Sequence, residues 1–575
     1  MVSRLLLLRR YFLVGLGLVL LRLMFLQLVQ GAMYRQLAEH NRLRLVPQPA
    51  PRGVIVDRLG RHLAANHLVF HIAAVPQDLR DRPDVFAKLS RLVHVPPSDL
   101  ERRFQDQRTL PFVPATLLKD VEKATAFRIE EARLELPGVV VTAVTARAYP
   151  FGDVAAHLLG YVGQPSAEEF PLLKRYGVKP QDLVGKAGVE QELEGYLRGE
   201  PGGSLIEVDH RARQVRVMGQ REPVPGQAVS LTIDAELQAL IQQAFGAQPG
   251  AAVVLRPQTG EALAVVSSPE FEPEAFSAQE VKRVRAALTD DRSPMLDRAA
   301  HGLYMPGSIA KIVTSMTALE HRVMQPDTPV TCPGFLTIGD RQFRCWNHDG
   351  HGVETMRGAL RDSCNVYFME VGRHLGLERL RTGFLSLGFG HHTGWLLGDD
   401  AGHVPGGRRL TEGEVAIFAI GQGELLITPL QAALMASAVA NGGWLVEPWV
   451  VRRVGDATMG RPHLTSLGWS REHLAVVREG MLAVVNDPHG TGHRAHSDHV
   501  VIAGKTGTAQ THQPGHPHGW FVGFCPADHP VAAMAVVAEH GGSGGDLPAS
   551  IGKAVCEYLV AHPLDVPSGA PSDPA

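Results

Sequence analysis

A serine and a lysine three residues apart are the first candidates for chemistry in this sequence. Ser308 follows a turn at Pro306 and Gly307 and precedes apolar residues at helical spacing, so Lys311 is expected one helical turn further on, facing Ser308. A buried lysine can lose its charge and take a proton from a serine hydroxyl, and a helix N-terminus favours developing negative charge. The pair is therefore competent as a nucleophile and its base.

This spacing alone does not identify a site, because Ser550 and Lys553 repeat it at the start of the predicted last helix. Lysine is scarce here, however, since 46 of the 56 cationic residues are arginine. Two further lysine- or serine-containing patterns follow Ser308 in order. Residues 363–365 read Ser-Cys-Asn at the head of a helical stretch, and residues 505–508 read Lys-Thr-Gly-Thr at the end of an apolar strand. Nothing comparable follows Ser550.

The three patterns supply complementary chemical roles. Ser363 can relay a proton to a leaving amine, and Asn365 can orient both Lys311 and a substrate amide. We therefore expect these groups to share one catalytic site with Ser308.

The third pattern supplies substrate-binding groups. Lys505, with the hydroxyls of Thr506 and Thr508, can hold a substrate carboxylate, and Gly507 lets a peptide backbone lie against the strand edge. The backbone N–H groups of Ser308 and Thr508 are expected to form an oxyanion hole.

The order S-x-x-K, S-x-N, K-T-G is the signature of penicillin-recognising serine acyltransferases. The chain resembles class B penicillin-binding proteins along nearly its whole length, and within them the penicillin-binding protein 2 subgroup of the elongation machinery. The segments PRGVIVDRLGRHLA, GKAGVEQELEGYLRG, LTIDAELQ and IGQGELLITPLQAALMASAVANGG resemble further family motifs. Asn365 departs from the subgroup, in which many members have Asp at this position.

The resemblance implies a serine D,D-transpeptidase of cell-wall elongation and cell shape. Ser308 would attack the penultimate D-alanine carbonyl of a peptidoglycan stem peptide and release the terminal D-alanine, and an amine of a neighbouring stem would then take the acyl group. β-Lactams would acylate the same serine. The implied partners are a SEDS-family glycosyltransferase and other elongation-complex proteins in the membrane, with no nucleic acid and no catalytic cofactor.

Two alternatives remain open at this point. A serine β-lactamase or D,D-carboxypeptidase shares the three patterns, although about 200 residues of stem and an uncleaved anchor argue against a lactamase. A protein that acts mainly as a non-catalytic activator or scaffold of the glycosyltransferase is the other alternative.

A second constellation concerns metal. Cys332, Cys345, His351 and Cys364 lie between the nucleophile and the Lys-Thr-Gly pattern, and three thiolates with one imidazole suit a closed, structural zinc site. A metal holding Cys364 would fix the loop that carries Ser363. A disulfide between Cys332 and Cys345, or unlinked buried cysteines, are the alternatives.

The N-terminus carries a predicted membrane anchor. Residues 5–29 contain a strongly apolar core, residues 11–21, between Arg9 and Arg10 on one side and Arg22 on the other. With these arginine stems extended to the interface, the whole segment is long enough to cross about 30 Å of hydrocarbon. The arginines before the span favour a cytoplasmic N-terminus. We therefore expect a single-pass protein of the inner membrane whose catalytic domain is periplasmic.

The remaining sequence predicts an α+β fold with two extracytoplasmic domains. A β-rich stem, or pedestal, covers residues 31–234, with a helical insert at about 76–136, and a transpeptidase domain covers 235–563. Two strands open that domain and three close it, which predicts one antiparallel sheet flanked by helices, of the β-lactamase/transpeptidase type. Residues 1–30 form the N-terminus and anchor, and residues 564–575 are expected to be a disordered tail.

The overall composition fits this architecture. The chain has 575 residues, 45% hydrophobic and 20% charged, with a net charge of −3. These values are ordinary for globular domains and argue against a basic, polyanion-binding protein. Five cysteines in this length exclude a fold built on disulfides.

Overall fold

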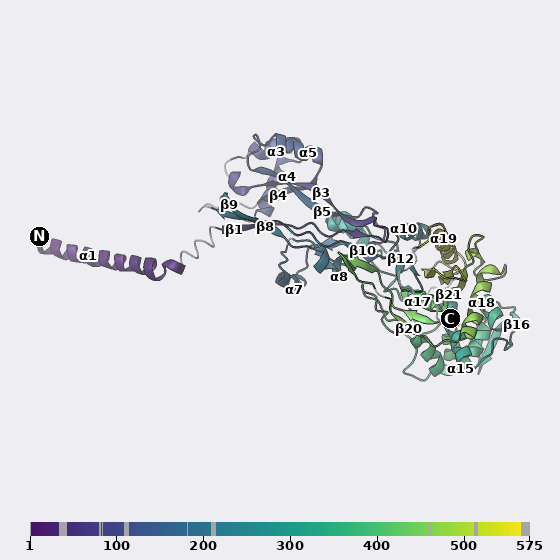
Figure 1. The fold of residues 1–575 in the computed structure, drawn as a ribbon. Coiled ribbons are helices and arrows are strands. Elements are labelled where there is room, and N and C mark those ends of the chain that lie inside the picture. The colour runs from purple at the N-terminus through teal and green to yellow at the C-terminus, as the bar shows by residue number, and fades with distance from the viewer. Residues whose placement is uncertain are drawn as a thin grey trace. The chain divides into compact units, whose positions relative to one another are not determined.

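The computed structural model describes residues 2–33, 43–79, 82, 84–108, 114–180, 182–208, 214–460, 462–510 and 516–564. The chain forms two compact units (Figure 1). The first contains residues 1–52, 66–146 and 198–226, and the second contains residues 53–65, 147–197 and 227–575. Of the predicted C-terminal tail, only residue 564 lies within the described part of the chain.

The N-terminal segment is helical, as its apolar sequence predicts. Helix α1 covers Val2–Met24 and continues as a π-helical turn over Phe25–Val29. Residues Leu8–Val29 are long and apolar enough to cross a membrane, with a mean hydropathy of 2.3. The described side chains of this segment are largely exposed to their surroundings, as they are in a helix that faces lipid.

Beyond α1, the described part of the first unit contains strands of two sheets and three further α-helices. Strand β8 (Gly202–Val208) lies between β1 (Leu43–Gln48) and β9 (Gln214–Arg221) in an antiparallel sheet. Strand β3 (His62–Ala74), whose first residues belong to the second unit, pairs with β4 (Ala115–Val121) and with β5 (Val139–Ala148). Helices α3 (Asp84–Val93), α4 (Pro97–Gln107) and α5 (Lys123–Glu131) pack on these strands. Where the segment from 76 to 136 is described, it therefore holds a 3-10 turn at Pro76–Asp78, three α-helices and one strand.

The second unit contains the predicted five-stranded antiparallel sheet, which is confirmed. Its order is β12-β11-β23-β22-β21. The strands are β11 (Gly250–Leu255), β12 (Ala262–Ser268), β21 (Ala503–Ala509), β22 (His518–Cys525) and β23 (Ala532–Ala538). The opening and closing segments of this unit meet where β11 pairs with β23, with Val253 opposite Ala535. Strand β21 lies at the edge of the sheet.

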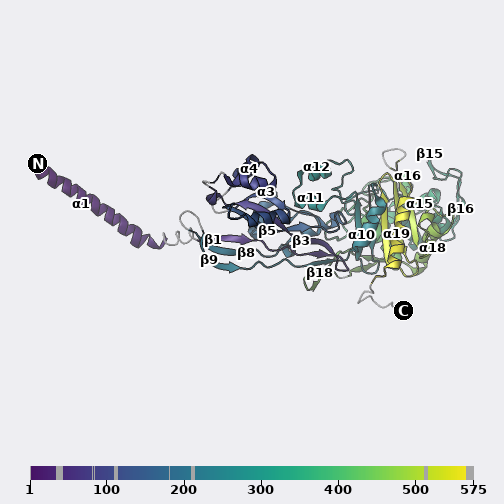
Figure 2. The same ribbon diagram turned by 90° about the horizontal axis from the view of Figure 1, so that it is seen from above.

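Helices cover both faces of this sheet because its strands are apolar on both sides. Val253 and Val254 are neighbours in β11 but belong to different cores, since successive side chains in a strand point to opposite faces. One face packs against α10 (Ala235–Phe245) and α19 (Leu547–Ala561), which Figure 2 shows next to each other. The other face packs against α17 (Pro429–Ala440).

A disulfide joins the end of β22 to α19, between Cys525 and Cys556. No sequence pattern indicated this pair. The bond closes a segment of 31 residues that contains β23 and the start of the last helix. It therefore ties the C-terminal helix to the sheet that it covers.

Five further helices of the second unit form a lobe beside the sheet that carries much of the candidate site. They are α13 (Lys311–Glu320), α14 (Met356–Arg361), α15 (Asn365–Ser386), α16 (Glu412–Ala419) and α18 (Arg471–Asn486). Two small two-stranded antiparallel sheets accompany them. These pair β13 (Val330–Cys332) with β16 (Gly352–Glu354), and β14 (Phe335–Ile338) with β15 (Arg341–Arg344).

Candidate functional site: a serine centre beside a cysteine–histidine cluster

Ser308 lies at the start of the predicted helix, within a 3-10 turn. The turn covers Gly307–Ala310 and leads directly into α13 at Lys311. Gly307 has φ +56°, and a Cβ there would lie 2.7 Å from the carbonyl oxygen of Thr508. Only glycine fits this position without displacing the backbone, because it tolerates positive φ and has no side chain. This fit holds the nucleophile segment against strand β21.

Lys311 is fully buried and its ammonium group points to the Ser-x-Asn segment. Its Nζ donates to the carbonyl oxygen of Ser363 at 2.7 Å and to Oδ1 of Asn365 at 2.8 Å. The distance from Nζ to Ser363 Oγ is 3.3 Å. The structure therefore brings together the lysine and the serine and asparagine of the second pattern, as the sequence predicts.

Ser363 also contacts the third pattern. Lys505 Nζ donates to Ser363 Oγ at 2.9 Å, so this hydroxyl lies between the two buried lysines. Ser363 has φ +54°, in the left-handed region that non-glycine residues rarely adopt. The strained backbone and the two lysine contacts fix the position of this hydroxyl.

Burial lowers the pKa of both lysines. Removal from water lowers the pKa of Lys311 to about 8, against a smaller opposing effect of the negative charge of Cys364 and Cys345. Burial, with the nearby charge of Lys311, holds the pKa of Lys505 well below its ordinary value. A pKa near 8 gives Lys311 a substantial neutral fraction near neutral pH, which a general base requires.

The patterns line one cavity of about 870 Å³. Ser308 is half-buried in its wall, and no hydrogen bond joins its hydroxyl to another described residue. The remaining polar lining residues from the three patterns are Ser363, Asn365, Thr506 and Thr508. The cavity thus exposes the proposed nucleophile next to groups that can bind a substrate carbonyl and carboxylate.

Several polar lining residues had no place in the sequence-based prediction, and two of them contact the third pattern. Thr491 Oγ1 lies 2.7 Å from Thr506 Oγ1 and precedes β21 by a loop, so nothing local marks it. Gln422 donates from Nε2 to the carbonyl oxygen of Thr508 at 3.2 Å. Gln422 belongs to the IGQGELL segment, which resembles a family motif. That resemblance marked the segment but assigned no role to Gln422.

Packing within the protein also requires glycine at position 507, in addition to the room that it leaves for a bound peptide. A Cβ there would lie 2.8 Å from the carbonyl oxygen of Pro306 and 3.0 Å from Cβ of Trp520. The glycine therefore lets β21 pack against the turn that carries Ser308.

The four predicted metal ligands come together. Ligand atoms of Cys332, Cys345, His351 and Cys364 all lie within 4.8 Å of one another, and the three cysteines are buried and free. The expected alternative of a Cys332–Cys345 disulfide is wrong in this structure. Cys332 ends β13, Cys345 follows β15, and Cys364 is the N-cap residue of α15.

The electrostatics of this cluster suit a cation. A hydrogen bond from the Cys364 thiol and three backbone N–H groups lower the pKa of Cys345 to about 4, and the same contact with Cys345 raises the pKa of Cys364. His351 Nδ1 lies 3.6 Å from Sγ of Cys332 and 3.6 Å from Sγ of Cys345. The cluster therefore concentrates thiol sulfurs and an imidazole nitrogen around one point.

Comparison with known proteins assigns both units to one family. The penicillin binding protein transpeptidase domain matches residues 250–557, and the penicillin-binding protein dimerisation domain matches residues 47–231. The peptidoglycan D,D-transpeptidase MrdA of Acinetobacter baumannii is 32% identical, over 96% of this chain and 87% of its own length.

Two solved structures are similar over most of both chains. One is the complex between penicillin-binding protein 2 and MreC from Helicobacter pylori, with a TM-score of 0.79 and 27% identity over 90% of this chain and 99% of that one. The other belongs to a peptidoglycan synthase complex that coordinates polymerization and crosslinking, with a TM-score of 0.74 and 30% identity over 98% of this chain and 100% of that one.

Proposed function

Because the chain belongs to the class B penicillin-binding proteins and is similar to penicillin-binding protein 2, we propose that Ser308 is the nucleophile of its D,D-transpeptidase reaction. The observation that carries this assignment is the convergence of the three patterns on one cavity, with Ser363 bonded to both Lys311 and Lys505. The reaction serves peptidoglycan cross-linking in cell-wall elongation.

The first half of the reaction is acylation. Ser308 Oγ attacks the penultimate D-alanine carbonyl of a stem peptide, while its proton passes to the neutral amine of Lys311. The bond to the terminal D-alanine breaks, and Ser363 relays a proton to the departing amine. The backbone N–H groups of Ser308 and Thr508 stabilise the oxyanion. No step needs a catalytic cofactor.

The second half is transfer to an amine. An amine of a neighbouring stem attacks the ester, forms the cross-link and returns the proton to Ser308. Lys505, Thr506 and Thr508 bind the carboxylate of the donor before it leaves, and Asn365 orients the donor amide. A β-lactam acylates Ser308 in the same way and inhibits the enzyme.

Release of D-alanine tests the assignment. We expect the full-length protein in detergent, supplied with a stem pentapeptide and an acceptor amine, to release D-alanine and form the cross-linked product. Ser308→Ala should lose both, while the matched change Ser550→Ala, which repeats the S-x-x-K spacing in α19, should retain both. Full activity of Ser308→Ala would refute the assignment, whereas no activity of the unmodified protein would favour the scaffold role.

We further propose that Cys332, Cys345, His351 and Cys364 bind a structural zinc ion. A tetrahedral site with Zn–S near 2.3 Å and Zn–N near 2.05 Å has S···N edges of about 3.6 Å, which matches both measured Sγ–Nδ1 distances. Such an ion would fix Cys364 between the catalytic Ser363 and Asn365, and so would stiffen the catalytic loop without taking part in the reaction.

The first helix supports a membrane location. We propose that Leu8–Val29 spans the inner membrane once and that the catalytic unit is periplasmic, because arginines precede the apolar stretch. Similarity to structures of a complex with MreC and of a peptidoglycan synthase complex supports elongation-complex partners, including a SEDS-family glycosyltransferase.

We also propose that the stem runs from residue 31 to 234 and the transpeptidase domain from 235 to 563.

A further inference from the structure

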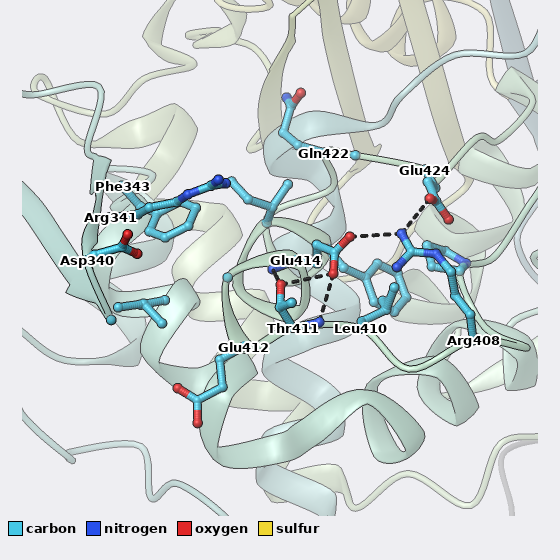
Figure 3. A pocket seen from close by; sticks show the side chains of 17 residues that line it. Asp340, Arg341, Phe343, Arg408, Leu410, Thr411, Glu412, Glu414, Gln422 and Glu424 are labelled. Atoms are coloured by element: carbon cyan, nitrogen blue, oxygen red, sulfur yellow. Dashed lines mark hydrogen bonds and ion pairs between the residues drawn. The ribbon is translucent and has the colours of Figure 1, made fainter.

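A second cavity of about 690 Å³ adjoins the catalytic cavity. The two have lining residues in common, namely Phe343, Ile417, Gln422 and Gly423. Figure 3 shows this second cavity, with Asp340, Arg341 and Phe343 on one side and Arg408 on the other. A ligand bound at Ser308 can therefore extend past Gln422 into it.

The second cavity combines apolar and charged lining. The apolar side chains are Ile338, Phe343, Leu410, Ile417 and Phe418. The charged side chains are Asp340, Arg341, Arg408, Glu412, Glu414 and Glu424. This combination suits a side chain that has a methylene stem and a charged end, because the stem can cover the apolar surface while the end stays among the charges.

The position of this cavity along β21 indicates which part of a substrate reaches it. The donor's terminal carboxylate, bound by Lys505 and the hydroxyls of Thr506 and Thr508, belongs towards the Lys505 end of the exposed strand edge. Thr508 lies three residues on, about 10 Å along the strand, and Gln422 contacts its carbonyl oxygen. The donor residues that precede the D-alanine pair therefore leave the catalytic cavity at the Thr508 end, towards Gln422.

Arg408 offers charges of both signs to a ligand at this point. Its Nη2 donates to Glu414 Oε1 at 2.9 Å and to Glu424 Oε1 at 2.7 Å, as Figure 3 shows. Among the described residues, its Nε and Nη1 have no hydrogen-bond partner. A carboxylate can therefore bind the remaining N–H groups of the guanidinium, while an ammonium group binds the adjacent glutamates.

We propose that this second cavity binds the side chain of the third residue of the donor stem peptide, and that Arg408 with Glu414 and Glu424 selects a side chain ending in an ammonium and a carboxylate on one carbon. The proposal rests on the transpeptidase function proposed above and adds the substrate class. A side chain that ends in an ammonium alone, such as lysine, leaves the guanidinium without a carboxylate and binds more weakly.

Competition with a fluorescent penicillin tests the selection without requiring turnover. Full-length protein in detergent is incubated with one of two pentapeptides that differ only at the third residue, diaminopimelic acid or lysine. Each peptide's inhibition constant follows from the slowing of penicillin acylation. We expect the diaminopimelic acid peptide to bind about fivefold more tightly, in line with a partly exposed charge-assisted contact.

Variants of Arg408 and of its neighbour Arg409 distinguish binding in the second cavity from a general loss of positive charge near the site. In Arg408→Ala the ratio of the two inhibition constants should fall to about one. In the matched control Arg409→Ala, a neighbouring arginine that does not line the cavity, the ratio should stay near five. Arg408→Gln, which removes the charge but keeps part of the side-chain stem, should also lower the ratio and replaces Arg408→Ala in the comparison if that variant does not fold.

The outcomes are distinguishable. Equal inhibition constants in the unmodified protein, no competition by either peptide, or the same loss of preference in Arg409→Ala would each overturn the proposed subsite. Failure of the unmodified protein to form a penicillin adduct would instead overturn the transpeptidase assignment on which the subsite rests.

Discussion

The pH dependence of acylation should report the burial of Lys311. If Lys311 is the base that takes the proton of Ser308, the second-order rate constant for acylation follows the neutral fraction of its amine. Burial lowers this pKa from 10.5 to about 8. The rate should therefore rise with pH through about 8 and become constant above it.

The size of the effect follows from that shift. At pH 7 the neutral fraction is about 9% for a pKa near 8, but about 0.03% for the ordinary value, a difference of about 300-fold. The rate constant should rise about tenfold between pH 6 and 7 and only about 1.1-fold between pH 9 and 10. A lysine with an ordinary pKa would instead give a rise of about a hundredfold between pH 7 and 9, with no plateau.

Stopped-flow acylation by a fluorescent penicillin, from pH 5.5 to 10 at constant ionic strength, measures the profile. Lys553→Ala is the matched control, because that lysine has the same spacing from a serine but lies on α19 in an ion pair with Glu557. Its profile should match that of the unmodified protein. A rate that is independent of pH, or one still rising steeply at pH 10, would refute the role and burial assigned to Lys311.

Three further changes test other parts of the structure. Gly307→Ala should reduce penicillin acylation at least a hundredfold, because the new methyl group would lie 2.7 Å from the Thr508 carbonyl oxygen and the residue would keep a positive φ. Acylation at the rate of the unmodified protein would contradict this packing. Cys332→Ala should abolish stoichiometric zinc by mass spectrometry and lower the melting temperature, whereas unchanged metal content would exclude the site. Cys525→Ala should destabilise the protein by about 3.7 kcal/mol in denaturant unfolding, from the chain entropy of a 31-residue loop, and unchanged unfolding would show that the bond does not form.

The catalytic sheet and the three patterns were predictable because local signals specify them. Apolar runs such as those around Val253 and Lys505 have the length of buried strands. The first two patterns lie where a helix begins, and the third lies within β21. Such signals also indicated the thiol and imidazole ligands, whose residue types are selective for metal. The order of opening and closing strands then required the chain ends to meet in one sheet.

The finer geometry was not predictable, because it depends on contacts between residues far apart in sequence. Lys505 and Ser363 are separated by 142 positions, and no local pattern states that their side chains meet. The left-handed backbone conformation of Ser363 and the contact of Gln422 with Thr508 likewise depend on contacts between distant parts of the sequence. Similarly, the pairing of Cys525 with Cys556 required the packing of α19 on β22.

The most direct test of the account is to locate the covalent adduct of a penicillin. Full-length protein in detergent is treated with benzylpenicillin and analysed by intact-mass and peptide mass spectrometry, alongside Ser308→Ala and Ser550→Ala. The account predicts one slowly released adduct on the peptide that contains Ser308, absent only from Ser308→Ala. An adduct on another residue, or none in the unmodified protein, would contradict it.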